Sequence, residues 1–239
     1  LLGRWISDLL RPGSREVMAI GFLGLLWAFS VSALVVLLVM APSLMPQWTE
    51  PFHPATWASS LRNPWADVWM VNLSLVGDVW VVAWLGGLMM GVFLITRRWV
   101  AAGHWAVALI GVYALASLIN TVMAGWVIES VPSAVPHPTL TQLPHRGFAL
   151  WVTTVSFFAL MVAKDLSARA RKWPYLVATL ISIPVGFSHF YLELASLPGL
   201  ATAVALALGW SALIGIGYRH RARITPFRMR CVGVFLVSG

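Results

Sequence analysis

VWMVNLSLVGDVWVVAWLGGLMMGVFLITRR, residues 68–98, is the stretch of sequence that decides the fold. From Val68 to Ile95 it holds a single charged residue, Asp78, and it then ends in the pair Arg97 and Arg98. A run of about 20 mostly apolar residues is long enough to cross the hydrocarbon core of a bilayer as a helix. The stretch therefore predicts a transmembrane helix with a positively charged loop at one end.

The composition of the whole chain agrees with a membrane protein. Hydrophobic residues make up 59% of the 239 residues, charged residues make up 10%, and the mean hydropathy is +0.83. A soluble domain could not solvate so apolar a surface. The net charge of +8 does not indicate nucleic-acid binding, because the basic residues lie in short loops beside apolar spans, where they set topology and contact anionic lipid headgroups.

All but two of the 16 Lys and Arg residues fall in four clusters that apolar spans separate. The clusters lie in residues 4–15, 97–98, 164–172 and 219–230. Because positive loops stay on the cytoplasmic side, an even number of crossings must separate one cluster from the next. The pattern predicts spans near residues 17–41, 68–95, 104–128, 147–163, 174–191 and 199–218. It also predicts a cytoplasmic N-terminus and an integral protein of the bacterial inner membrane.

The predicted fold class is all-α, a polytopic membrane bundle with a six-helix core. Residues 1–16 are expected to form a cytoplasmic N-terminal segment, residues 17–220 the membrane domain, and residues 221–239 the start of a seventh span that is cut short in a fragment of a longer protein. Near the outer face, residues 54–62 alternate apolar and polar side chains and are expected to form an interfacial helix. The proline-rich loop of residues 129–146 is not expected to be helical.

Polar residues inside a membrane are costly and usually face a bundle interior or a cavity. In the predicted topology the end of the third span, the start of the fourth and the end of the fifth all reach the outer face. These places carry polar residues that could meet there: Asn120, His145, Arg146, His189 and Glu193.

This arrangement resembles the type 2 phosphatidic acid phosphatase superfamily, which includes lipid phosphate and undecaprenyl pyrophosphate phosphatases. The segment NLSLVGD at residues 72–78 is similar to the early Leu-x-x-x-Gly-Asp segment of the family. The segment VGFSHFYLELASLPGLATAVALALGW at residues 185–210 is similar to its third motif and the following helix. The resemblance covers residues 68 to 220 and implies a helical membrane fold with an outward-facing phosphate site.

In an active member of that family, the first motif supplies Lys and, seven residues on, Arg-Pro, and the second supplies Pro-Ser-Gly-His. In this chain the Lys position is Asn120, and the Arg-Pro positions are Val127 and Ile128. Pro144 matches the second motif, but residues 145–147 read His-Arg-Gly, so His145 serves the general-acid position only from a shifted register.

The third family motif supplies Ser-Arg, a nucleophilic His six residues after the Arg, and an Asp four residues further on. Ser188 matches, but the Arg position is His189, the nucleophile position is Ala195 and the Asp position is Gly199. The cations neutralise the phosphoryl oxygens and the imidazole attacks phosphorus, which a methyl group cannot do. The resemblance therefore implies a degenerate member without the catalytic motifs.

Two functions follow from this sequence. The favoured one is a noncatalytic, phosphatase-like membrane protein that serves as an accessory or scaffold subunit, or as a lipid-binding module, of a larger complex. It would bind a lipid or an anion through Asn120, His145, Arg146 and His189. The alternative is an enzyme that removes phosphate from lipid phosphates or polyprenyl pyrophosphate at the periplasmic face. Such an enzyme would use His145, Arg146, His189 and Glu193, with Glu193 orienting His189 from four residues along the same helix face.

For these polar residues themselves the plainest interpretation is that they lie at the interface and are wetted by water, without a ligand. Two further interpretations are weaker. A transporter with Asp78 as its proton site would need a repeated pair of broken helices, and no repeat is visible. The high Trp content is explained by interfacial belts and packing better than by a pigment or quinone site. We predict no metal and no cofactor, and we expect membrane lipids and membrane-protein subunits as partners.

Overall fold

The computed structural model describes residues 14–49, 60–130, 142–167 and 169–221, and every regular element within these ranges is an α-helix. The helices are α2 (Ser14–Thr49), α4 (Pro64–Val76), α5 (Val79–Ile95), α6 (Trp99–Ser130), α7 (Arg146–Asp165), α8 (Lys172–Tyr191) and α9 (Leu197–Arg221). The predicted all-α class is confirmed. Outside the described residues lie the predicted seventh span, most of the interfacial helix expected at 54–62 and most of the loop at 129–146.

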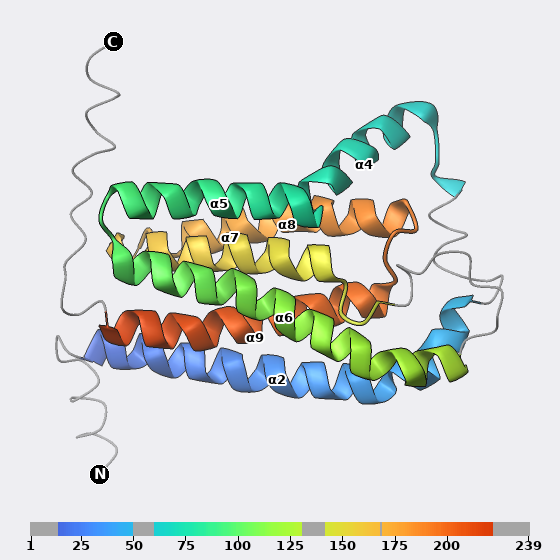
Figure 1. Ribbon diagram of the computed structural model, residues 1–239, viewed down its shortest axis with the longest axis horizontal. Helices are drawn as coiled ribbons and strands as arrows, with labels where there is room; N and C mark the ends of the chain where they lie inside the picture. The colour runs from blue at the N-terminus through green and yellow to red at the C-terminus, as the bar shows by residue number, and fades with distance from the viewer. Residues whose placement is uncertain (1–13, 50–59, 131–141, 168, 222–239) are drawn as a thin grey trace.

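Six long helices run side by side in one bundle, while the short α4 projects away from it (Figure 1). Helix α7 is the central one, because it packs against α5, α6, α8 and α9. In its most apolar stretch 78% of the residues are buried, whereas the corresponding share in α2 is 11%. Helix α2 covers one side of the bundle, mainly along α9.

The bundle is a membrane protein by the length and apolarity of its helices. Within the described residues, α2, α6, α7 and α9 are each long and apolar enough to cross a bilayer, and α4 and α5 qualify together as one broken span. Helix α8 has the length of a span but is not in this set, because Ser, Thr, His and Pro residues lower its hydropathy. The predicted spans therefore correspond to helices, but the second one is not a single helix.

The second span is broken at Gly77 and Asp78, where α4 and α5 meet at an angle of 48°. The carboxylate of Asp78 accepts a hydrogen bond of 2.8 Å from the backbone N–H of Trp80 and so caps α5. The backbone N–H of Gly77 bonds to the carbonyl of Ser74 and ends α4. An Asp at an N-cap satisfies a helical donor that would otherwise lack a partner. Gly77 therefore ends α4 and Asp78 starts α5.

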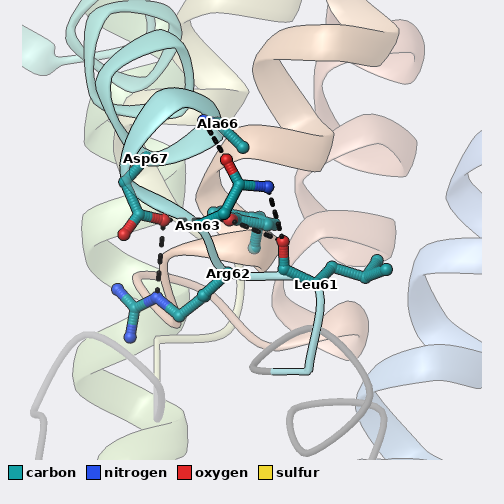
Figure 2. Close-up of polar contacts among 6 residues, drawn as sticks. Leu61, Arg62, Asn63, Ala66 and Asp67 are labelled. Carbon is teal, nitrogen blue, oxygen red and sulfur yellow. Dashed lines mark hydrogen bonds and ion pairs between the residues drawn. The ribbon is translucent and has the colours of Figure 1, made fainter.

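The far end of α4 is tied to the end of α8 by polar contacts. Asn63 caps α4 through a 2.8 Å bond from the N–H of Ala66, and the Asp67 carboxylate lies 3.8 Å from Nε of Arg62 (Figure 2). The hydroxyl of Tyr191, at the last turn of α8, donates to Asp67 over 2.9 Å. Because the Arg62–Asp67 pair is exposed, the capping and the tyrosine bond are the contacts that position α4.

Two groups of buried side chains fill the bundle. One contains Phe148, Val185, Ala195 and Leu200, close to the start of α7 and the end of α8. The other is at the opposite end, where the rings of Phe93, Trp105, Phe157 and Tyr218 succeed one another with centroids about 6 Å apart. Small residues let these rings approach the backbone, and Trp105 donates to the carbonyl of Gly86 over 3.0 Å.

The closest approach of α6 and α9 predicts an asymmetry between two glycines of one helix. A methyl group on Gly111 would meet the rigid indole of Trp210, whose Cε2 would be 2.8 Å away, whereas nothing lies within 4 Å of a methyl group on Gly103. We expect Gly111→Ala to lower the thermal melting temperature in detergent through an overpacking cost of about 1–3 kcal/mol. Gly103→Ala should be neutral or stabilising. Equal melting temperatures for the two variants would contradict this packing.

Candidate functional site

Polar residues that the sequence predicted to converge do meet in the structure, around two histidines. His145 comes just before α7 and His189 lies in the last turn of α8. Their rings are perpendicular neighbours, with centroids 5.1 Å apart and an interplanar angle of 73°. Both side chains are buried, with exposed fractions of 9% and 3%. The prediction that these chain segments converge is therefore correct.

Asn120 holds the segment that leads to His145. Its Nδ2 donates to the carbonyl of Pro144 over 2.7 Å and to that of Ala116 over 2.8 Å, and its Oδ1 accepts from the N–H of Leu143 over 2.8 Å. The amide is thus committed to backbone groups of its own helix and of the turn before α7. Asn120 was predicted to bind a lipid or an anion, and in this geometry it fastens α6 to that turn.

His145 caps helix α7, and its surroundings disfavour the protonated ring. Its backbone N–H donates to the carbonyl of Gly199 over 3.0 Å, and its Nδ1 accepts from the N–H of Phe148 over 3.3 Å, which makes it the N-cap of α7. Since Nδ1 is an acceptor, the neutral ring carries its proton on Nε2. Burial, and then the nearby His189 and Arg146, lower the pKa of His145 to about 3.

His189 is oriented by its own helix. Its Nδ1 lies 2.8 Å from the carbonyl of Val185, and since a carbonyl can only accept, Nδ1 carries the proton and Nε2 is left as the basic nitrogen. On one side the ring contacts Phe148, with centroids 6.1 Å apart. The carboxylate of Asp78 is close enough to act electrostatically on the imidazole.

Glycines bring backbone against this histidine pair. A methyl group on Gly77 would lie 2.6 Å from Cε1 of His189, and one on Gly147 would lie 2.7 Å from the carbonyl oxygen of Gly77. The break between α4 and α5 is therefore packed directly onto α7 and α8. The Gly77 turn thus lies against the fourth and fifth predicted spans.

The nucleophile and Asp positions of the third motif lie beyond α8, Ala195 in the turn that follows it and Gly199 in the first turn of α9. The carbonyl of His189 accepts from the N–H groups of Leu194 and Ala195, over 2.8 and 3.2 Å, and this ends the helix. The methyl group of Ala195 is in the core, with 2% exposed. Gly199 offers its carbonyl to His145, and a methyl group there would lie 2.7 Å from the carbonyl of Gln142.

The predicted pairing of His189 with Glu193 along one helix face is wrong. Helix α8 ends at Tyr191, and Glu193 has a φ of 56°, in the left-handed region. Among the residues that the structure describes, no hydrogen bond or ion pair joins these two side chains. Arg146 is the first residue of α7 and half-buried, and it acts on His145 electrostatically.

The sequence did not reveal the packing role of three glycines. Gly77, Gly147 and Gly199 each allow a backbone or ring contact that a methyl group would obstruct. The signal that could have identified two of them is their position, since Gly77 precedes Asp78 and Gly147 follows Arg146 at a helix end, whereas Gly199 in the first turn of α9 has no polar neighbour in the sequence. In the described part of the chain, no three His, Cys, Asp or Glu side chains gather where they could hold a metal ion.

Comparisons with known proteins agree with this architecture. The sequence matches no known family profile and no curated protein. The structure is similar to the crystal structure of the first transmembrane PAP2-type phosphatidylglycerolphosphate phosphatase from Bacillus subtilis, with a TM-score of 0.61 and 20% sequence identity. The match covers 83% of this chain and 98% of that chain.

The helices of this chain define a polytopic membrane protein of the helical-bundle class. More specifically, the chain has the fold of the type 2 phosphatidic acid phosphatases, as the resemblance of its motifs predicted. At this level of identity the likeness concerns the fold, so the chemistry of the site has to be argued from the residues that stand in it.

The hydrogen bonds by which Asn120 joins α6 to the turn before α7 can be tested with a matched asparagine. Asn120→Ala would leave the N–H of Leu143 and the carbonyl of Pro144 without their partner, at a cost of about 1–3 kcal/mol. Asn72→Ala is the control, since Asn72 is exposed and donates only to Val68 in its own helix. We expect a lower melting temperature in detergent for Asn120→Ala alone. Similar decreases in the melting temperature of both variants would contradict this role of Asn120.

The lowered pKa of His145 predicts a pH dependence of stability. In the unfolded chain this histidine titrates near the ordinary value of 6.5, but in the folded protein the neutral form persists down to about 3. Between these values the unfolded state binds the extra proton, so stability is present above about pH 6.5 and falls as the pH is lowered. His145→Asn keeps a capping residue and cannot titrate there. We expect its melting temperature to fall less than that of the wild type between about pH 7 and 4. Parallel curves would contradict the assignment.

Proposed function

We propose that this chain is a noncatalytic membrane protein with a phosphatase fold, acting as an accessory or scaffold subunit or as a lipid-binding module of a larger membrane complex. The observation that carries the proposal is Ala195, which occupies the nucleophile position of the third motif as a buried methyl group. A methyl group has no lone pair with which to attack phosphorus.

The surroundings of the histidine pair support the same proposal. Phosphoryl transfer requires positive charge around the equatorial oxygens. Here the Lys position is an asparagine bonded to backbone carbonyls, and Arg146 is the cation that acts on His145. The backbone at Gly77 also lies directly against His189, where a substrate would have to approach its ring.

An altered phosphatase is the second candidate, and one observation favours it. His189 carries its proton on Nδ1 and so keeps a basic Nε2, next to a second imidazole that could donate a proton to a leaving oxygen. This geometry is compatible with a lipid phosphatase that uses His189 in place of the usual nucleophile. Such an enzyme would require the α4–α5 break to move away from the ring.

We place the basic ends of the helices in the cytoplasm and the histidine pair at the opposite face of a bacterial inner membrane. The basic clusters of the sequence support this orientation through the positive-inside rule. Broad apolar faces remain on the outside of the bundle, including Trp80 and Trp84 of α5 at 77% and 74% exposure. These faces are available to lipid or to partner helices.

Phosphate release decides between the two candidates. Purified protein is incubated with phosphatidic acid, phosphatidylglycerolphosphate and undecaprenyl pyrophosphate in mixed micelles, beside His189→Ala and Arg146→Ala variants. We expect no release above the level of the variants, because Ala195 cannot form a phosphoenzyme. Release that either substitution abolishes would establish the enzyme and overturn the noncatalytic proposal.

A further inference from the structure

A long groove lies on the side of the bundle between α2, α7, α8 and α9. Its volume is about 970 Å³, within the size range of ligand sites. Its walls are mostly apolar and include Leu26 of α2, Val152 of α7, Ile183 and Phe187 of α8, and Val204 of α9. The groove follows α8 from Lys172 to Phe190, which corresponds to roughly 27 Å of helix, close to the thickness of the hydrocarbon core.

The groove is electrostatically one-sided. Arg171 and Lys172 at the start of α8 and Arg219 near the end of α9 line one end, and the described lining residues include no acid. The other end is lined by Phe190, Leu197 and other apolar residues. Positive charge at one mouth of an apolar channel is complementary to a molecule with an anionic head and a hydrocarbon tail.

The basic end also contains a donor without a partner. Nε of Arg219 is buried, and within the described part of the chain no group accepts a hydrogen bond from it. Buried guanidinium donors are normally satisfied, so this one calls for an acceptor that enters the groove. Arg171 differs, because its Nε already donates to the carbonyl of Leu166 over 3.0 Å and holds the α7–α8 turn.

We propose that this groove binds one anionic phospholipid, with an acyl chain along α8 and its phosphate at Lys172 and Arg219. A phosphate oxygen accepts well from guanidinium and ammonium groups, and a net negative headgroup is preferred over a zwitterionic one. The lipid enters laterally from the leaflet at the basic end of the bundle. It is a bound component of the protein and does not enter the histidine site.

The groove and the histidine pair are separate sites that share a wall. The ring of Phe148 lines the groove away from its basic end and also contacts His189. The phosphate position lies at the basic end, whereas His145 and His189 lie at the opposite end of the bundle. The inference rests on the lipid-binding branch of the proposed function, and retained lipid is measured independently of phosphate release.

Native mass spectrometry of the full chain tests the proposal. The protein is delipidated in a neutral detergent, mixed with vesicles of equal parts phosphatidylglycerol and phosphatidylcholine, and re-extracted. We expect one retained phosphatidylglycerol and at least about tenfold less phosphatidylcholine, since each basic residue contributes roughly a fivefold preference. Equal retention of the two lipids overturns the proposal.

Two variants with the same change in charge locate the site. Lys172→Gln/Arg219→Gln removes two groove cations and should reduce the preference for phosphatidylglycerol by roughly fivefold for each, or about 25-fold together. Arg97→Gln/Arg169→Gln removes two basic residues near the same end that do not line the groove, and should leave the preference unchanged. Equal effects of the two double variants would mean unspecific surface attraction and overturn the site.

A third variant tests the acyl chain. Thr179 lines the groove and is exposed, so Thr179→Trp should fill the chain position and reduce retention of the lipid. If this variant instead releases a copurifying protein and leaves lipid retention unchanged, the groove holds a partner helix and the proposal is wrong. The result of the phosphate-release assay does not affect the lipid-retention measurements, and the amount of retained lipid does not affect the phosphate-release assay.

Discussion

The close approach of Gly77 to His189 is the contact on which the histidine-bearing half of the bundle depends. It brings the end of one helix, the start of a second and the sides of α7 and α8 within van der Waals distance, with Gly147 completing the contact. Backbone can pack against a ring in this way only where there is no side chain in between. The capping of α5 by Asp78 then gives the interrupted chain a way to continue as a helix.

The same packing explains why the polar residues of the site behave as they do. Three of them have a backbone partner: Asn120 at the turn before α7, His145 at the N–H of Phe148 in α7, and His189 at Val185. Polar groups in a membrane domain are retained when their hydrogen bonds are satisfied within the protein. A cluster that satisfies itself is well suited to joining helices and has few donors left for a phosphate.

The broad architecture could be predicted from the sequence, because it follows from strong signals. Apolar run length predicted the helices, and helix order with the segments at 72–78 and 185–210 predicted the fold. The convergence of Asn120, His145 and His189 followed from that topology. These are consequences of where the chain crosses the membrane, which hydropathy and framework residues reveal.

Three details could not be predicted because they depend on tertiary contacts. The break at residues 77–78 is visible only when α7 and α8 are seen to accommodate it, since the mostly apolar run at 68–95 is long enough for one continuous span. The end of α8 at Tyr191 depends on the left-handed turn at Glu193, a conformation that glycine adopts more easily. The groove between α2 and α8 has no local pattern at all, because four helices contribute its walls.

The 48° angle between α4 and α5 changes the footprint of the molecule. A straight pair of these lengths would extend about 45 Å, but α4 adds only about 13 Å along the direction of α5 and reaches about 15 Å sideways. The exposed indoles of Trp65 and Trp69 are carried on this sideways arm, at 75% and 55% exposure. Their amphipathic rings prefer the headgroup layer. The pair α4–α5 has enough apolar residues for a crossing, but its bend turns α4 into a side arm that carries two interfacial anchors. Such an arm restricts the tilt and depth of the protein in the bilayer.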